Sequence, residues 1–227
     1  MRRFNLFQTS HSALRSLMLD TCLRIQFTDF SSAQQVQSSF DQIMDLVLSC
    51  QRQAEEEGRY IVPAILVFNQ QVGAGFAPFE NGIHSPVMRL LRCMDLFERE
   101  AGTERATRLA PVLLMNGFRK FAEQVIAGIQ AQEDQLNPLL WMYYSDEALR
   151  HLQQKIEGRQ TISEWLSGSE WMMKDMTDDE ITQWMLEVSS TLPPQVYAML
   201  VDHISAKIPM LRWRKVQLGL QNNLRVA

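Results

Sequence analysis

Apolar residues recur every three or four positions along most of this chain, and this helical period limits the fold more than any other feature. One such row runs from Leu14 to Ile25, and a longer row runs from Phe40 to Ile65. No segment of the sequence shows the sustained alternation of a half-buried strand, and no hairpin turn signal appears. The sequence therefore predicts an all-α protein.

Four long amphipathic segments, joined by short connections, account for residues 1–144. Segments of this kind bury their apolar rows by packing as an antiparallel up-down four-helix bundle. Shorter helical segments follow, and two of them open with a Thr-x-x-Glu capping box, at Thr161 and Thr177. We therefore expect a bundle domain over residues 1–144 and a C-terminal helical region, packed on that bundle, over residues 145–227.

The second amphipathic segment carries the longest inward row and a proline near its end. The members of the row are Phe40, Ile43, Val47, Cys50, Ala54, Glu57, Ile61 and Ile65. Pro63 has no backbone N–H and restricts the residue before it, so a kink or an end of the helix is expected near residue 62.

Charge and cysteine content disfavour several classes of protein. The formal net charge is -4, which argues against a general polyanion-binding role, so we expect no nucleic-acid partner. No apolar run approaches membrane-spanning length, and we expect no membrane partner. Three widely spaced cysteines without a Cys-x-x-Cys pair are typical of reduced thiols, which indicates a cytoplasmic protein.

The last helical segment is locally basic, with the sequence RWRKVQLGLQNNLR over residues 212–225. We interpret it as a solvated helix that packs on the rest of the chain through its apolar side chains. The residues expected to make that contact are Leu211, Trp213, Val216, Leu218 and Leu220.

Several polar residues fall on the inward rows, where a helix bundle builds its metal sites. They are His11, Gln53, Glu57, Glu80, His84 and Gln132. An unpaired charge buried at such a position is costly, so these groups are expected either to bind a metal or to pair with one another.

Five segments of the chain resemble the bacterial hemerythrin-like, HHE cation-binding family. They are HSALR at 11–15, TDF at 28–30, AEEEGRYIVPAI at 54–65, ENGIH at 80–84 and LLWMYYSDEAL at 139–149. The resemblance extends to the helical C-terminal part, with WMMKDMTDDEITQWM. It implies a four-helix bundle that holds two irons between His and carboxylate ligands, for oxygen or nitric oxide binding, sensing or iron handling.

The resemblance carries three of the family's ligand positions over to this chain. His11 matches the first-helix histidine, and Glu57 matches the glutamate of the second-helix His-x-x-x-Glu. His84 matches the second histidine of the third-helix His-x-x-x-His. The resemblance therefore implies a remnant metal site of His11, Glu57 and His84.

The other ligand positions depart from the family pattern. Gln53 replaces the second-helix histidine, and Glu80 replaces the first histidine of the third helix. Gly128 and Gln132 stand where the fourth helix would supply a His and a Glu. An amide oxygen is a weak, neutral ligand, whereas iron favours imidazole and carboxylate. A di-iron centre is therefore not expected.

The favoured prediction is a non-enzymatic binding or regulatory protein with an unidentified protein partner and no cofactor. Its degenerate site would be a metal-free network in which Glu57 accepts from His11 or His84, while Gln53 and Gln132 donate and accept across the bundle. The alternative is a metal-binding protein with an altered site made by His11, Glu57, His84 and Glu80. Such a site would hold iron for oxygen or nitric oxide binding, sensing or iron handling.

Overall fold

The structure is a computed structural model that describes residues 3–69, 78–100, 103–159 and 161–224, without the side chains at 78–84, 104–107, 110 and 224. All regular structure in these ranges is helical, which confirms the all-α prediction. The elements are α1 (Gln8–Phe27), α2 (Ala33–Glu56), the π-helix η1 (Glu57–Ile61), α3 (Val62–Leu66), α5 (Pro78–Arg99), α6 (Glu104–Tyr143), α7 (Asp146–Glu157), α8 (Ile162–Asp175), α9 (Asp178–Ser189), α10 (Pro194–Lys207) and α11 (Met210–Leu224).

The helices form two compact units. The first unit comprises Met1–Phe7 and Leu17–Ile156, and the second comprises Gln8–Ser16 and Glu157–Ala227. Helix α1 therefore contributes its first half to the second unit and its second half to the first unit.

The two units divide after Ile156, whereas the sequence led us to expect domains that meet between residues 144 and 145. Helix α7 stays with the first unit because Leu149 is fully buried in a cluster with Phe7 and Leu140. The chain start also holds this helix in place, since Arg3 donates to the Asp146 carboxylate at 2.6 Å.

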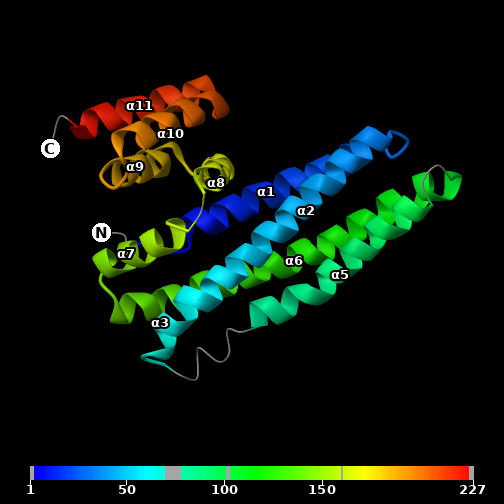
Figure 1. The fold of residues 1–227 in the computed structure, drawn as a ribbon, viewed down its shortest axis with the longest axis horizontal. Coiled ribbons are helices and arrows are strands. Elements are labelled where there is room, and N and C mark those ends of the chain that lie inside the picture. Colours follow the sequence, from blue (N-terminus) through cyan, green and yellow to red (C-terminus); the bar gives the residue numbers. More distant parts are fainter. Residues whose placement is uncertain (1–2, 70–77, 101–102, 160, 225–227) are drawn as a thin grey trace. The chain divides into compact units, whose positions relative to one another are not determined.

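The core of the first unit lies between long helices, of which α5 runs along α6 and α2 contacts α5 (Figure 1). All eight members of the row predicted for the second segment, from Phe40 to Ile65, are buried. Phe97 of α5 meets Phe30 and Phe40 edge-on, which packs the start of α2 against α5. The helical period thus predicted the burial of these eight positions, but it missed Val36 and Leu46 of α2, which are buried as well.

The second unit is built on a cluster of large side chains from α8, α9, α10 and α11. Both predicted capping boxes are present, with Thr161 paired to Glu164 and Thr177 paired to Glu180 at the starts of α8 and α9. These boxes satisfy backbone N–H groups that have no partner inside the helix.

Helix α11 packs on this cluster through one face only. Val216 is fully buried, and Trp213 and Leu220 pack against the cluster. Leu211 and Leu218 are exposed, so the prediction that all five apolar residues pack inward is wrong for these two. Residues 211 and 218 are two turns apart and share the outward face of the helix.

No helix in the described ranges combines the length and the apolar character needed to cross a membrane.

Candidate functional site

The carboxylate of Glu57 lies in the interior of the first unit between two glutamine amides. Gln53 Nε2 donates to Glu57 Oε1 at 2.6 Å, and Gln132 Nε2 donates to Oε2 at 2.5 Å. The Glu57 residue is only 6% exposed, and both glutamines are buried. Each carboxylate oxygen therefore accepts a hydrogen bond from a neutral side chain. The sequence led us to expect His11 or His84 as the donor to Glu57, and that pairing stays a prediction.

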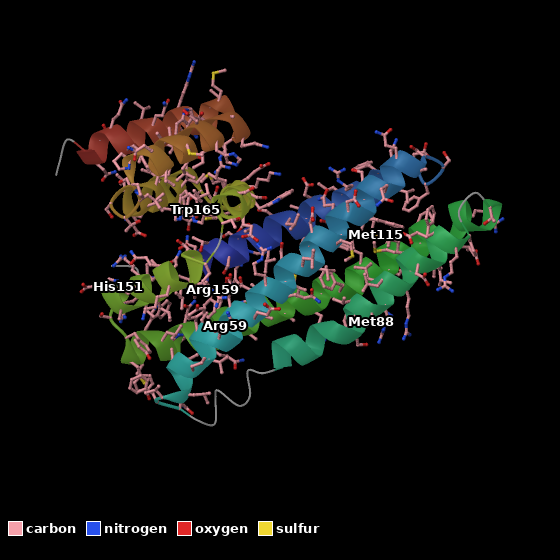
Figure 2. The ribbon with its side chains drawn as sticks, viewed as in Figure 1. Arg59, Met88, Met115, His151, Arg159 and Trp165 are labelled. Carbon is pink, nitrogen blue, oxygen red and sulfur yellow. The ribbon has the colours of Figure 1, made fainter. Side chains whose placement is uncertain are left out.

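The helix changes its geometry at the same residue. Helix α2 ends at Glu56, and Glu57 opens the π-helix η1, where Val62 N–H bonds to the Glu57 carbonyl across the wider turn. Arg59, labelled in Figure 2, lies in this turn. Pro63 then occupies the first turn of α3, where a missing N–H costs little.

The interruption predicted near residue 62 is thus a π turn followed by a new α-helical turn, and the inward row continues through it to Ile65. Short π segments inside helices often mark functional sites. The π turn and the buried carboxylate therefore single out the same position of the chain, Glu57.

Cys50 lies on the same inward row, two turns before Glu57, and is fully buried. Burial raises the pKa of the Cys50 thiol to about 12, and the negative charge of Glu57 adds to the effect. Both causes disfavour the thiolate, which is the reactive form of cysteine. Cys50 therefore acts as a small apolar residue in the core near Glu57.

Gln132 of α6 takes part in the hydrogen-bond network around Glu57 and has one acceptor atom that the network does not use. Its Nε2 donates to Glu57, but its buried Oε1 has no hydrogen-bond partner among the described residues. A buried acceptor without a partner typically costs about 1–3 kcal/mol. The network around Glu57 therefore keeps one acceptor, Gln132 Oε1, that a further donor could use.

The other members of the predicted site are less fully described. His11 is fully buried in the half of α1 that belongs to the second unit, whereas Glu57 belongs to the first, so their pairing stays a prediction. His84 and Glu80 lie in α5, and their side chains fall outside the described residues. Among the side chains that are described, no group of three or more His, Cys, Asp or Glu is placed to hold a metal ion.

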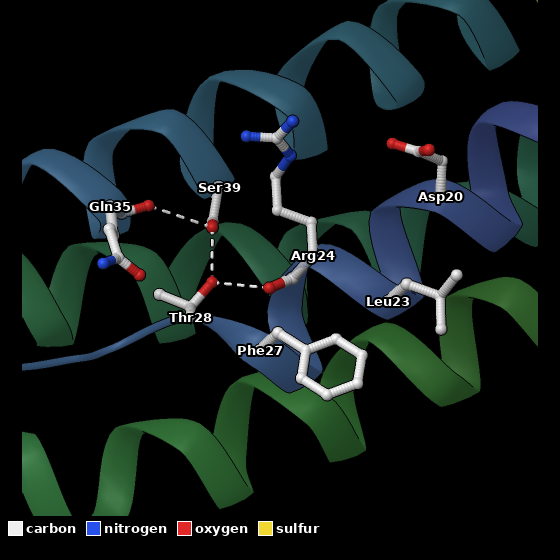
Figure 3. A pocket seen from close by; sticks show the side chains of 7 residues that line it. All are labelled: Asp20, Leu23, Arg24, Phe27, Thr28, Gln35 and Ser39. Atoms are coloured by element: carbon white, nitrogen blue, oxygen red, sulfur yellow. Dashed lines mark hydrogen bonds between the residues drawn. The ribbon is translucent and has the colours of Figure 1, made fainter.

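A surface hollow of about 300 Å³ lies between α1 and α2 in the first unit (Figure 3). Leu23, Phe27 and the charged pair Asp20 and Arg24 line it from α1, and Ser39 is among the residues that line it from α2. The inward apolar rows of the sequence do not indicate this hollow, because it lies on the surface of the two helices. The sequence does contain a sign of this surface, because Leu19, Leu23 and Phe27 follow one another at intervals of four residues. This spacing places a second apolar row on α1.

Comparisons with known proteins found no relative of this chain. No protein-family model, curated protein or solved structure matches the chain. The likeness to the hemerythrin-like family therefore stays a prediction that rests on the sequence segments quoted above.

Proposed function

We propose that this chain is a hemerythrin-like four-helix bundle protein in which a metal-free hydrogen-bond network replaces the di-iron centre. It acts in the cytoplasm as a binding or regulatory protein for another protein, and it is not an enzyme. Free Cys22, Cys50 and Cys93 are consistent with a reducing compartment.

One observation carries this proposal, namely the pair of amide N–H groups that face the oxygens of Glu57. An iron ligand must direct a lone pair at the metal, and Gln53 and Gln132 direct N–H donors at the carboxylate instead. The described part of the site therefore fits a hydrogen-bond network better than it fits the ligand set of iron.

Metal analysis tests the proposal directly. The full chain is produced in iron-supplemented medium, purified without chelator, and analysed for metal by plasma mass spectrometry. We expect iron far below stoichiometry. Near-stoichiometric iron with an oxo-to-iron absorption band, lost in His84→Ala, would overturn the proposal in favour of an altered iron site.

A variant with restored ligands tests the family assignment separately. Gln53→His, Gly128→His and Gln132→Glu together return three ligand positions to the family pattern while His11, Glu57 and His84 stay native. We expect this triple variant to take up iron that the wild type does not. A folded triple variant that binds no iron, measured in the same preparation, would count against the hemerythrin-like assignment.

A further inference from the structure

The second apolar row of α1 is exposed at every one of its positions. Leu19 is 65% exposed, Leu23 is 46% exposed and Phe27 is 76% exposed. They follow one another at intervals of four residues, so they share one face of the helix. Leu23 and Phe27 also line the hollow between α1 and α2. A contiguous apolar surface next to a hollow is a frequent mark of an interaction site.

The wall of this hollow is held by a chain of hydrogen bonds between the two helices (Figure 3). Thr28 Oγ1 donates to the Arg24 carbonyl at 2.6 Å and accepts from Ser39 Oγ at 2.6 Å. Ser39 Oγ also lies 3.0 Å from the Gln35 carbonyl, and its single proton is shared between these two acceptors. A surface that is already ordered loses little conformational entropy when a partner binds.

Two opposite charges flank the apolar row, one helical turn apart. Asp20 accepts from Gln42 Nε2 at 2.8 Å, and Arg24 donates from Nη1 to Ser38 Oγ at 2.8 Å. These bonds to α2 keep both charged groups on the side of α1 that borders the hollow. Between Leu17 and Phe27 they are the only charged residues, so this stretch of α1 carries one charge of each sign.

We propose that this surface binds a second copy of the chain, with the two α1 helices antiparallel around a two-fold axis near Leu23. Leu23 then meets Leu23 of the second copy, and Leu19 meets Phe27, because both are four residues from the axis. In a two-fold contact the same flank faces itself, so Asp20 of each copy lies on the same flank as Arg24 of the other, offset by two residues or about 3 Å along the helix, which the long arginine side chain can span.

The charges favour a second copy over a nucleic acid or an anionic membrane. Either of those would favour an excess of basic residues, whereas this stretch of α1 carries one charge of each sign. An antiparallel copy brings each charge near the opposite charge of the other copy and also pairs both ends of the apolar row. The interface does not depend on the metal content of the Glu57 site, so the two proposals succeed or fail separately.

Sedimentation equilibrium of the full chain tests the interface first. We expect a concentration-dependent dimer in the wild type. Leu23→Glu places two like charges at the axis and should raise the dissociation constant by about tenfold or more. The matched control is Leu48→Glu on α2, because Leu48 is 50% exposed and lies outside the proposed contact. A wild type that stays monomeric, or equal effects of the two variants, would overturn the proposal.

A charge exchange tests the antiparallel register. Asp20→Arg and Arg24→Asp should each weaken self-association, because each places like charges opposite one another. An equimolar mixture of the two variants should form heterodimers, since both pairs are then complementary. Circular dichroism confirms that the variants are folded. If the folded variants fail to associate when mixed, the register is wrong and the proposal falls.

Discussion

Glu57 is the acceptor that allows two glutamine side chains to be buried in the core of the first unit. Its two oxygens accept from Gln53 and Gln132, and each of those bonds satisfies a buried amide. Hydrogen bonds to charged groups typically contribute about 1.5–3 kcal/mol, and unsatisfied buried groups cost a similar amount. Substitutions at this position therefore act chiefly through the two glutamines.

We expect Glu57→Leu to lower the free energy of unfolding by about 3 kcal/mol, because it leaves two buried amides without an acceptor. Glu57→Gln should cost only about 1 kcal/mol, because the new amide can donate to Oε1 of Gln132, which is an available acceptor. Urea denaturation followed by circular dichroism measures both. Equal losses in the two variants would show that hydrogen-bond pairing does not control this site.

Cys50 gives a second prediction about a single side chain, which concerns the reactivity of its thiol. Its pKa is raised to about 12, so the thiol stays protonated at pH 8, and its reaction with iodoacetamide should become fast only as the pH approaches that value. Cys22 is half-buried and serves as the internal comparison, with peptide mass spectrometry to read each site. Rapid labelling of Cys50 in the folded protein at pH 8 would contradict this assignment.

Hydrogen bonds from Arg212 of α11 link the end of α8 to the start of α9. Its guanidinium donates to the carbonyls of Met173 and Met176 and pairs with Asp178 at 2.7 Å. The hydrogen bond from Arg212 is the main cause that lowers the pKa of Asp178, and the positive charges of Arg212 and Lys215 act in the same direction. The ionised carboxylate is therefore the form that stabilises the second unit.

We expect Arg212→Met to lower the free energy of unfolding by about 2 kcal/mol at pH 7, whereas Arg214→Met, an exposed change in the same helix, should have little effect. The folded-state pKa of Asp178 lies below its usual 3.8, so this stabilisation is present above that value and is lost as the pH falls further. Trp fluorescence during urea denaturation, repeated at several pH values, measures the free energy of unfolding of the wild type and of Arg212→Met. If the difference between the two does not become smaller as the pH falls below 3.8, the role of Asp178 is contradicted.

Much of the helical structure was predictable from the sequence. The features that were not predictable have a physical cause. The row from Phe40 to Ile65 was predictable because the helical period determines which face is inward. The row also predicted that Glu57 needs a buried partner, but it did not identify Gln53 and Gln132 as the donors, because the row does not show which polar groups of neighbouring turns and helices meet. The period does not say how much of a second apolar face a neighbour covers, so Leu211 and Leu218 were misassigned. Pro63 indicated an interruption, but the π turn depends on the backbone path.

The boundary between the two units is set by packing around the start of the chain. Trp141 donates to the Phe4 carbonyl at 2.7 Å, and Arg150 lies over the Phe4 ring. Together with the buried Leu149, these contacts make α7 part of the first unit.

A fragment that ends at Ile156 should therefore melt about 5–10 °C above one that ends at Tyr144. The shorter fragment loses Leu149, and removal of a buried leucine side chain typically costs about 2–5 kcal/mol. Thermal denaturation followed by circular dichroism compares them, and both fragments lack the same later helices. Equal melting temperatures would place the structural boundary at residue 144 instead.

The division of α1 between two cores has a consequence for how the chain responds to its surroundings. Arg15 bonds to Asp175 in the second unit, while Ile25, two to three turns later in the same helix, is buried in the first. A helix is a cooperative structure, so melting of one half weakens the other. Anything that stabilises one unit should therefore protect the other against heat, and α1 would be the means by which that protection is transmitted.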